Sequence, residues 1–154
     1  DNVGKAQAGQ GAEALVAYRE SLDIRRQLRQ ALGDSPQVLR DLSVSLDNVG
    51  KAQEQAGQGA EALVAYRESL DIRRQLRQAL GDSPQVLDDL AVSLERVAIQ
   101  SALSLSERQH CFQEALSLRE RLVSALPQNN FYAQRLATLR RLEPSEPAPD
   151  ASAS

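Results

Sequence analysis

Residues 8–46, AGQGAEALVAYRESLDIRRQLRQALGDSPQVLRDLSVSL, decide the fold, because almost the same stretch occurs again at residues 56–94. The two copies are identical at 37 of 39 positions. They differ only where Arg40 is replaced by Asp88 and Ser43 by Ala91. A unit repeated at this length predicts an array in which each unit buries its apolar face against its neighbours.

The repeat extends on both sides of this stretch. Residues 1–7, DNVGKAQ, recur as residues 47–53, whereas Glu54 and Gln55 have no counterpart in the first copy. A third, diverged copy follows, in which seven spaced residues over 112–126 match in kind the residues 46 positions earlier. Length varies in the connector inside each unit, as expected of a loop that packs little.

Each copy has the pattern of two helices. Over residues 86–97 the apolar side chains recur every three or four positions, which places them on one helical face. Gly81 suits a helix C-terminus, and Ser83 followed by Pro84 suits the start of the next helix. No stretch alternates apolar and polar residues over strand length, so the sequence predicts an all-α fold without a sheet. About seven helices are expected, at residues 1–8, 11–32, 36–56, 59–80, 84–104, 107–126 and 129–142.

The predicted division is an array over residues 1–142 and a tail over residues 143–154. The array would comprise a truncated first pair at 1–32, a second pair at 36–80, a third pair at 84–126 and a capping helix at 129–142. The tail holds three prolines among small or acidic residues, which predicts disorder. Asp1 corresponds to the middle of a helix in the second copy, and the chain contains no Met, so we expect a piece of a longer protein, whose targeting region could have been lost with the missing part.

A helix pair repeated with small residues at fixed points resembles the tetratricopeptide repeat family. The residues that carry the resemblance are Leu46-x2-Val49-Gly50 followed by Ala62-x3-Tyr66. The small Gly50 and Ala62 would let the helices of a pair approach closely. The long unit is similar to long-repeat bacterial members and to kinesin light chain repeats. The resemblance implies an α-solenoid of antiparallel helix pairs that forms a right-handed superhelix.

In that family the first helix of each pair usually lines a concave groove that holds a partner peptide. By position, the resemblance implies eight groove residues here: Asp47, Asn48, Lys51, Glu54, Gln55, Glu95, Arg96 and Ile99. Residues 34–55 hold four acidic against two basic residues, and residues 82–104 hold four acidic against one basic. We therefore expect a mildly acidic groove that binds a neutral or basic protein segment. The alternative is that these side chains form solvated polar faces without a ligand.

Two further patterns admit a functional and a structural interpretation. Arg25, Arg26 and Arg29 recur as Arg73, Arg74 and Arg77, so stacking would align them into a ladder that could hold an acidic partner. Ion pairs with Asp23 and Asp71 are the structural alternative. His110 and Cys111 are adjacent, but neighbours on a helix point about 100° apart and neither completes a catalytic set.

Composition excludes several classes of protein. A net charge of −3 with five aromatic residues argues against nucleic-acid binding. A single cysteine excludes an internal disulfide, and a single histidine excludes a zinc site with several Cys and His ligands. No apolar run approaches the length of a membrane span. We expect no enzyme activity, no catalytic residue, no metal and no cofactor.

Two functions remain for such an array. The first is a non-enzymatic, cytoplasmic adaptor or scaffold for protein–protein interaction. The second is a structural spacer or self-association module of a larger protein, which near-identical copies would suit. Because the first pair is truncated, the helix at 11–32 would expose an apolar strip, and homodimerisation through this end is expected.

Overall fold

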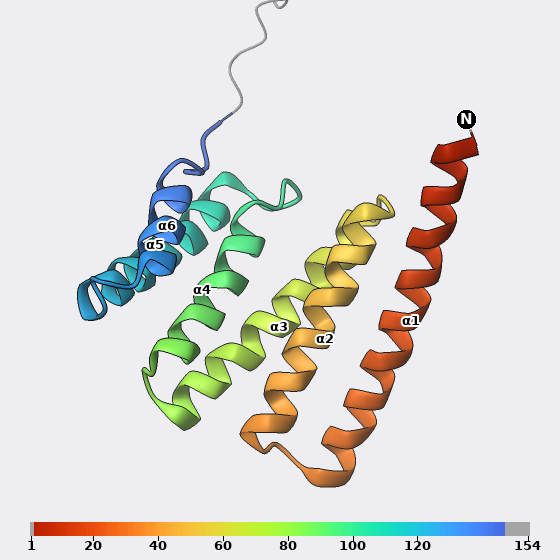
Figure 1. Cartoon of the computed structure of the whole chain (residues 1–154), viewed down its shortest axis with the longest axis horizontal. Helices are drawn as coiled ribbons and strands as arrows, with labels where there is room; N and C mark the ends of the chain where they lie inside the picture. Colours follow the sequence, from red (N-terminus) through yellow and green to blue (C-terminus); the bar gives the residue numbers. More distant parts are fainter. Residues whose placement is uncertain (1, 147–154) are drawn as a thin grey trace, which may run out of the picture.

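The computed structural model describes residues 2–146, and six helices in sequence order account for most of them. Their bounds are α1 Asn2–Leu32, α2 Pro36–Gln55, α3 Gly59–Leu80, α4 Pro84–Ala98, α5 Leu105–Ala125 and α6 Asn130–Arg140. The described residues contain no strand, which confirms the predicted all-α class. Each helix packs mainly on the helices before and after it, so the array runs from α1 at one edge to α6 at the other (Figure 1). The second helices of the successive units are α1, α3 and α5, and the first helices are α2, α4 and α6.

The helix ends follow the predicted capping residues. The hydroxyl oxygens of Ser35 and Ser83 accept hydrogen bonds from the backbone N–H groups three residues later, both at 3.4 Å. Gly33 and Gly81 close α1 and α3 with φ angles of 81° and 80°, which other residues adopt only at a cost. The same short turn therefore joins α1 to α2 and α3 to α4.

The first unit differs from the second at its internal turn. We expected separate helices at 1–8 and 11–32, whereas α1 is continuous through Gly9 and Gly11. In the second unit, Gly57 reverses the chain with a φ of 76°, and the N–H of Gln58 donates to the Gln53 carbonyl at 2.8 Å. The first unit lacks the two residues that precede this turn. Residues 2–10 of α1 are exposed.

Two other bounds shift for local reasons. Helix α4 ends at Ala98, not near 104, because the Gln100 side chain donates to the Arg96 carbonyl at 3.0 Å and Leu103 turns into the core. The hydroxyl of Ser104 then caps α5, which begins at Leu105 rather than 107. After α6 the chain remains against the array as far as the buried Pro144. Residues 147–154, most of the predicted tail, lie outside the described part.

Two apolar clusters form the core, and α3 contributes to both. One cluster joins α1, α2 and α3, and the other joins α3 to α4, α5 and α6. At the closest approach of α2 and α3, a Cβ atom placed on Gly50 would lie 2.6 Å from Cε1 of Tyr66. Gly50 is thus required for the aromatic ring to pack there. The sequence predicted a small residue at this position for close helix packing, but not that it faces Tyr66.

Candidate binding surface

The predicted groove residues all lie on the first helices or directly after them. On α2 the positions Arg40, Val44, Asp47 and Lys51 recur every three or four residues and therefore share one side of the helix. On α4, Asp89, Arg96 and Ile99 lie at similar helical spacing, and Asp89 lies 3.7 Å from Arg40 of α2. We call the surface formed by these two series the first-helix face.

Asp47 was predicted as an exposed groove residue, but its side chain is buried. Its Oδ2 atom lies 2.7 Å from Nη2 of Arg73 and 2.7 Å from Nη1 of Arg96. Arg73 also donates from Nη1 to the Ser93 hydroxyl at 2.8 Å and to the Asp89 carbonyl at 3.1 Å. The carboxylate thus connects α2, α3 and α4, and a partner could not reach it without displacing these cations.

Glu54 is also bound within the array. Its carboxylate accepts one hydrogen bond from the Tyr66 hydroxyl at 2.8 Å and another from Nε2 of Gln100 at 2.7 Å. The guanidinium of Arg96 lies over the Tyr66 ring at 5.8 Å from its centroid. Burial, followed by the hydrogen bond to Glu54, raises the pKa of Tyr66 above its ordinary value. The hydrogen bond from Gln100 to Glu54 therefore joins the turn after α4 to the end of α2.

Glu95 also binds a side chain inside the array. The side chain of Arg119 on α5 is fully buried, and its Nε donates to Glu95 at 2.7 Å. The Nη1 atom of Arg119 donates to Asp88. Asp88 is one of the two positions at which the copies differ, and this ion pair explains the difference: Arg40, its counterpart, lies 3.7 Å from Asp89 instead. Two of the three predicted acidic groove residues, Asp47 and Glu95, are thus paired with buried arginines.

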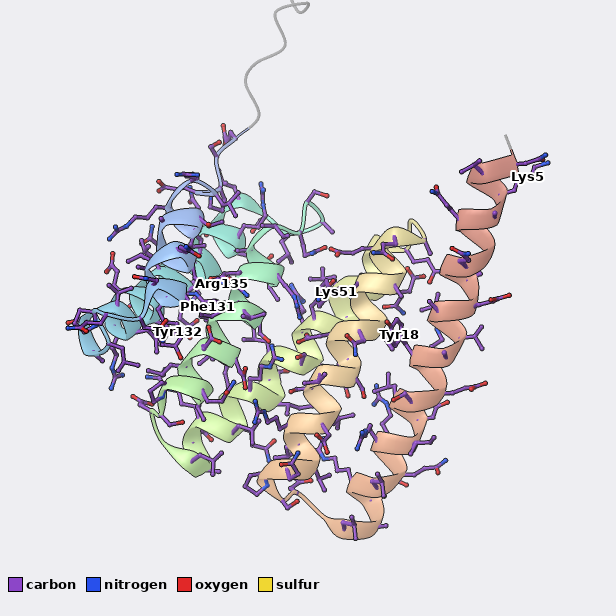
Figure 2. The ribbon with its side chains drawn as sticks, in the orientation of Figure 1. Lys5, Tyr18, Lys51, Phe131, Tyr132 and Arg135 are labelled. Atoms are coloured by element: carbon purple, nitrogen blue, oxygen red, sulfur yellow. The ribbon has the colours of Figure 1, made fainter. Side chains whose placement is uncertain are left out.

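The remaining predicted residues are accessible. Asn48 is half-buried, whereas Lys51 and Gln55 are exposed. Ile99 keeps 59% of its surface exposed. Lys51 makes no ion pair with any described residue, and Figure 2 shows its position on α2. Lys51 and Ile99 are therefore the predicted residues best placed to contact a partner.

The arginine ladder is occupied by internal partners. The pairs are Arg25–Asp41 at 3.2 Å, Arg73–Asp47 at 2.7 Å, Arg26–Glu68 at 2.9 Å, Arg74–Glu114 at 2.8 Å, Arg29–Asp34 at 2.7 Å and Arg77–Asp82 at 2.7 Å. The first arginine of each set faces a first helix, the second bridges to the next second helix, and the third binds the following turn. Asp23 and Asp71, the predicted partners, form no ion pair among the described residues. The ladder therefore connects neighbouring units.

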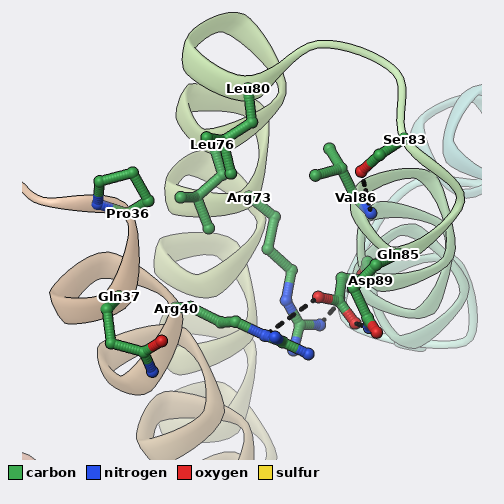
Figure 3. A pocket seen from close by; sticks show the side chains of 10 residues that line it. All are labelled: Pro36, Gln37, Arg40, Arg73, Leu76, Leu80, Ser83, Gln85, Val86 and Asp89. Carbon is green, nitrogen blue, oxygen red and sulfur yellow. Dashed lines mark hydrogen bonds and ion pairs between the residues drawn. The ribbon is translucent and has the colours of Figure 1, made fainter.

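A pocket of about 210 Å³ opens between the starts of α2 and α4 (Figure 3). Its lining includes Leu76 and Leu80 of α3, the Arg73 side chain, and Arg40 with Asp89. Gln37 of α2 and Gln85 of α4 add two amide groups to the lining. Because Arg40 and Asp89 also begin the first-helix face, the pocket continues that face toward the start of the helices.

The sequence did not single out this pocket or Val44, whose exposure is 46%. A signal was present: Val44 and Arg40 precede Lys51 at helical spacing, so the predicted face could have been extended by two turns. The pocket itself carries no such signal, since it depends on the angle at which α2 and α4 meet α3.

The remaining reactive residues do not form a site. His110 is exposed, and Cys111 is a half-buried free thiol. Burial, with a smaller contribution from the Glu114 charge, raises the pKa of Cys111, so the thiol stays protonated at neutral pH. Within residues 2–146 no three His, Cys, Asp or Glu side chains come together as metal ligands. No helix in this part of the chain has the length and apolar character needed to cross a membrane.

Comparison with known proteins does not assign the chain to a family, so only its fold class is known. No family model matches the chain, and no curated protein matches its sequence. The fold and surface define an all-α array of repeated helix pairs, and the function has to be argued from the surface itself.

Proposed function

We propose that this chain is a non-enzymatic scaffold that binds a protein or peptide segment along the first-helix face. The observation that carries the proposal is the continuity of that face with the α2–α4 pocket. Arg40 lines the pocket, and Val44 and Lys51 follow it about one and three turns later on the same side of α2. Ile99 stands at the position of Lys51 one unit later. The resemblance of the unit to tetratricopeptide repeats supports the same use of the first helices.

Rigidity of the face supports this proposal. Asp47 and Glu95 bind arginines of the second helices, so the first helices are held at fixed positions by charge-assisted hydrogen bonds and ion pairs. A preorganised surface loses little conformational entropy when a partner binds. The ion pairs of Asp47 and Glu95 therefore also keep the first-helix face rigid.

The partner that we propose is a neutral segment with apolar side chains. The carboxylates that would have attracted a basic segment are occupied by Arg73, Arg96 and Arg119. The exposed side chains at Val44 and Ile99 favour apolar contacts, and Lys51 can bind a backbone carbonyl at the rim. A cytoplasmic location belongs to this proposal, and the free thiol of Cys111 is in keeping with a reducing compartment.

Selection from a library of displayed random peptides tests the proposal. Peptides enriched on the chain are expected to bind about tenfold more weakly to Val44→Glu and to Ile99→Glu, because each change places a charge on the apolar part of the face. Val64→Glu is the matched control, since Val64 is 67% exposed on α3, away from this face. Charge reversal at Asp47 or Glu95 is unsuitable, because it would break the internal ion pairs.

Two results would contradict the proposal. One is the absence of any enriched peptide. The other is enrichment of peptides that bind Val44→Glu and Ile99→Glu as tightly as the unchanged chain.

The second candidate function, a self-association or spacer module, is favoured by a different observation. Ile24 and Leu28 on α1 are exposed at 56% and 37%, so the edge of the array presents apolar surface. Sedimentation velocity over a range of concentrations tests self-association directly. A monomer at all concentrations would refute it.

A further inference from the structure

One face of α1 is exposed although the same residues are buried one unit later. Tyr18, Ile24 and Leu28 are exposed at 41%, 56% and 37%, whereas the identical residues 48 positions later are almost inaccessible to solvent. Those counterparts are Tyr66 at 1%, Ile72 at 4% and Leu76 at 5%. Because the side chains are identical, the difference arises only from what covers them.

In the second unit the covering element is α2. Gly50 of α2 lies against the Tyr66 ring, and the Ser69 hydroxyl donates to the Ser43 carbonyl of α2 at 3.1 Å. Asp47 of α2 reaches Nη2 of Arg73 at 2.7 Å. Apolar residues of α2 share one cluster with α3; they are Leu39, Leu42, Leu46, Val49 and Ala52, packed with Ile72 and Leu76.

The partner residues of these three contacts are all present on α1. Tyr18, Ser21 and Arg25 stand at the positions of Tyr66, Ser69 and Arg73. Arg25 uses Nη1 for Asp41 at 3.2 Å, and no contact of its Nη2 atom is seen with a described residue. The whole recognition surface for a helix of the α2 type is thus repeated on α1, and Figure 2 shows Tyr18 on that helix.

We propose that this face of α1 docks a separate amphipathic helix with the side-chain pattern of α2. The docked helix would carry a glycine against Tyr18, a carboxylate three residues earlier for Arg25, and an apolar ridge for Ile24 and Leu28. The Ser21 hydroxyl would donate to a backbone carbonyl of the docked helix. This site lies at the edge of the array and does not depend on the first-helix face.

Helices α2 and α6 of a second copy do not supply such a helix. The α2 helix of another molecule is already packed between its own α1 and α3. Helix α6 is a first helix by position, but Arg140 is charged where the equivalent residue of α4, Leu94, is fully buried. A separate segment with the α2 pattern therefore fits this face better than either of those helices.

A peptide of residues 35–56 of this chain, labelled with fluorescein at its N-terminus, is the probe. Fluorescence anisotropy is expected to show saturable binding to the full chain. Ile24→Glu should weaken binding at least tenfold, because it places a charge in the centre of the face. Val16→Glu should leave binding unchanged, since Val16 and its counterpart Val64 are both solvent-exposed, at 55% and 67%.

A change in the peptide tests the recognition pattern itself. Gly50→Leu in the peptide should also weaken binding at least tenfold, because the new side chain would meet the Tyr18 ring. Ile24 is mostly exposed, so circular dichroism of Ile24→Glu should match that of the unchanged chain and show that the variant folds. Lys51→Glu in the full chain should not alter peptide binding, which separates this site from the first-helix face.

Three results would overturn the proposal. The first is the absence of saturable binding. The second is peptide binding that persists in Ile24→Glu, because the peptide would then dock elsewhere. The third is self-association of the chain that Ile24→Glu abolishes while the peptide does not bind, because that result would assign the face to a second copy.

Discussion

Substituting Gly50 by alanine tests the closest helix contact of the array. The added Cβ atom would lie 2.6 Å, 2.9 Å and 3.0 Å from three atoms of the Tyr66 ring, where ordinary contacts begin at 3.4 Å. The ring has little room to retreat, because Tyr66 is 1% exposed and its hydroxyl is held by Glu54 at 2.8 Å. Overpacking of this kind costs about 1–3 kcal/mol.

Part of that cost is offset, because alanine is favoured over glycine in a helix by about 0.5–1 kcal/mol. We therefore expect Gly50→Ala to lower the free energy of unfolding by about 1–2 kcal/mol, or the Tm by about 2–8 °C for a chain of this size. The chain contains its own control. Gly4 has the same neighbours in sequence, yet a Cβ there would meet nothing within 4 Å, so Gly4→Ala should stabilise α1 by about 0.5–1 kcal/mol.

Urea unfolding followed by circular dichroism at 222 nm measures both changes. The cause can be isolated by repeating Gly50→Ala in a Tyr66→Leu background, where the aromatic ring is absent and the alanine should be neutral or stabilising. The reasoning is refuted if Gly50→Ala is as stable as the unchanged chain, or if its cost persists without the ring.

Three other outcomes are expected. Arg119→Met should cost about 3 kcal/mol, because it leaves two partly buried carboxylates without their partner. Arg121→Met, at a surface ion pair, should stay within about 1 kcal/mol by the same urea assay, and equal costs would contradict the assignment. Hydrogen bonds from Arg77, and then from a second arginine, lower the pKa of Asp82 from its ordinary 3.8 to about 2, so its stabilising effect is complete above pH 4 and disappears toward pH 2. Asp82→Asn should remove that part of the acid dependence of thermal unfolding, and an unchanged acid profile would count against it. Gly57→Ala should destabilise the chain by about 1 kcal/mol because Gly57 has a positive φ. Gly9→Ala, at the corresponding position within α1, should stabilise the chain. Thermal melts in which both changes destabilise the chain equally would contradict this difference between the two units.

Much of the secondary structure followed from the sequence because its causes are local. The apolar spacing placed four of the six helices within two residues at each end, and Gly81 with Ser83 marked the turn between α3 and α4. The need for a small residue at Gly50 was also predictable, because the repeat places it at the helix contact of a pair, whereas its contact with the Tyr66 ring was not predicted.

The candidate binding surface was only partly predictable, and the charged residues show why. Asp47 and Lys51 lie one turn apart on α2 and look alike in sequence, yet one is buried between two arginines and the other is exposed. The difference depends on where Arg73 and Arg96 arrive from neighbouring helices. Periodicity identifies the face of a helix but not the side chains that cross to it from another element.

The sequence by itself determined the helices, their order and the repetition of the interface, because spacing, capping and identical copies act within or between adjacent segments. Only the tertiary structure decided which carboxylates are structural, where a pocket opens between α2 and α4, and that α1 runs straight. Identical residues at Tyr18 and Tyr66 have different surroundings because burial depends on the helix beside them. A repeated sequence can therefore specify an interface and still leave one copy of it uncovered.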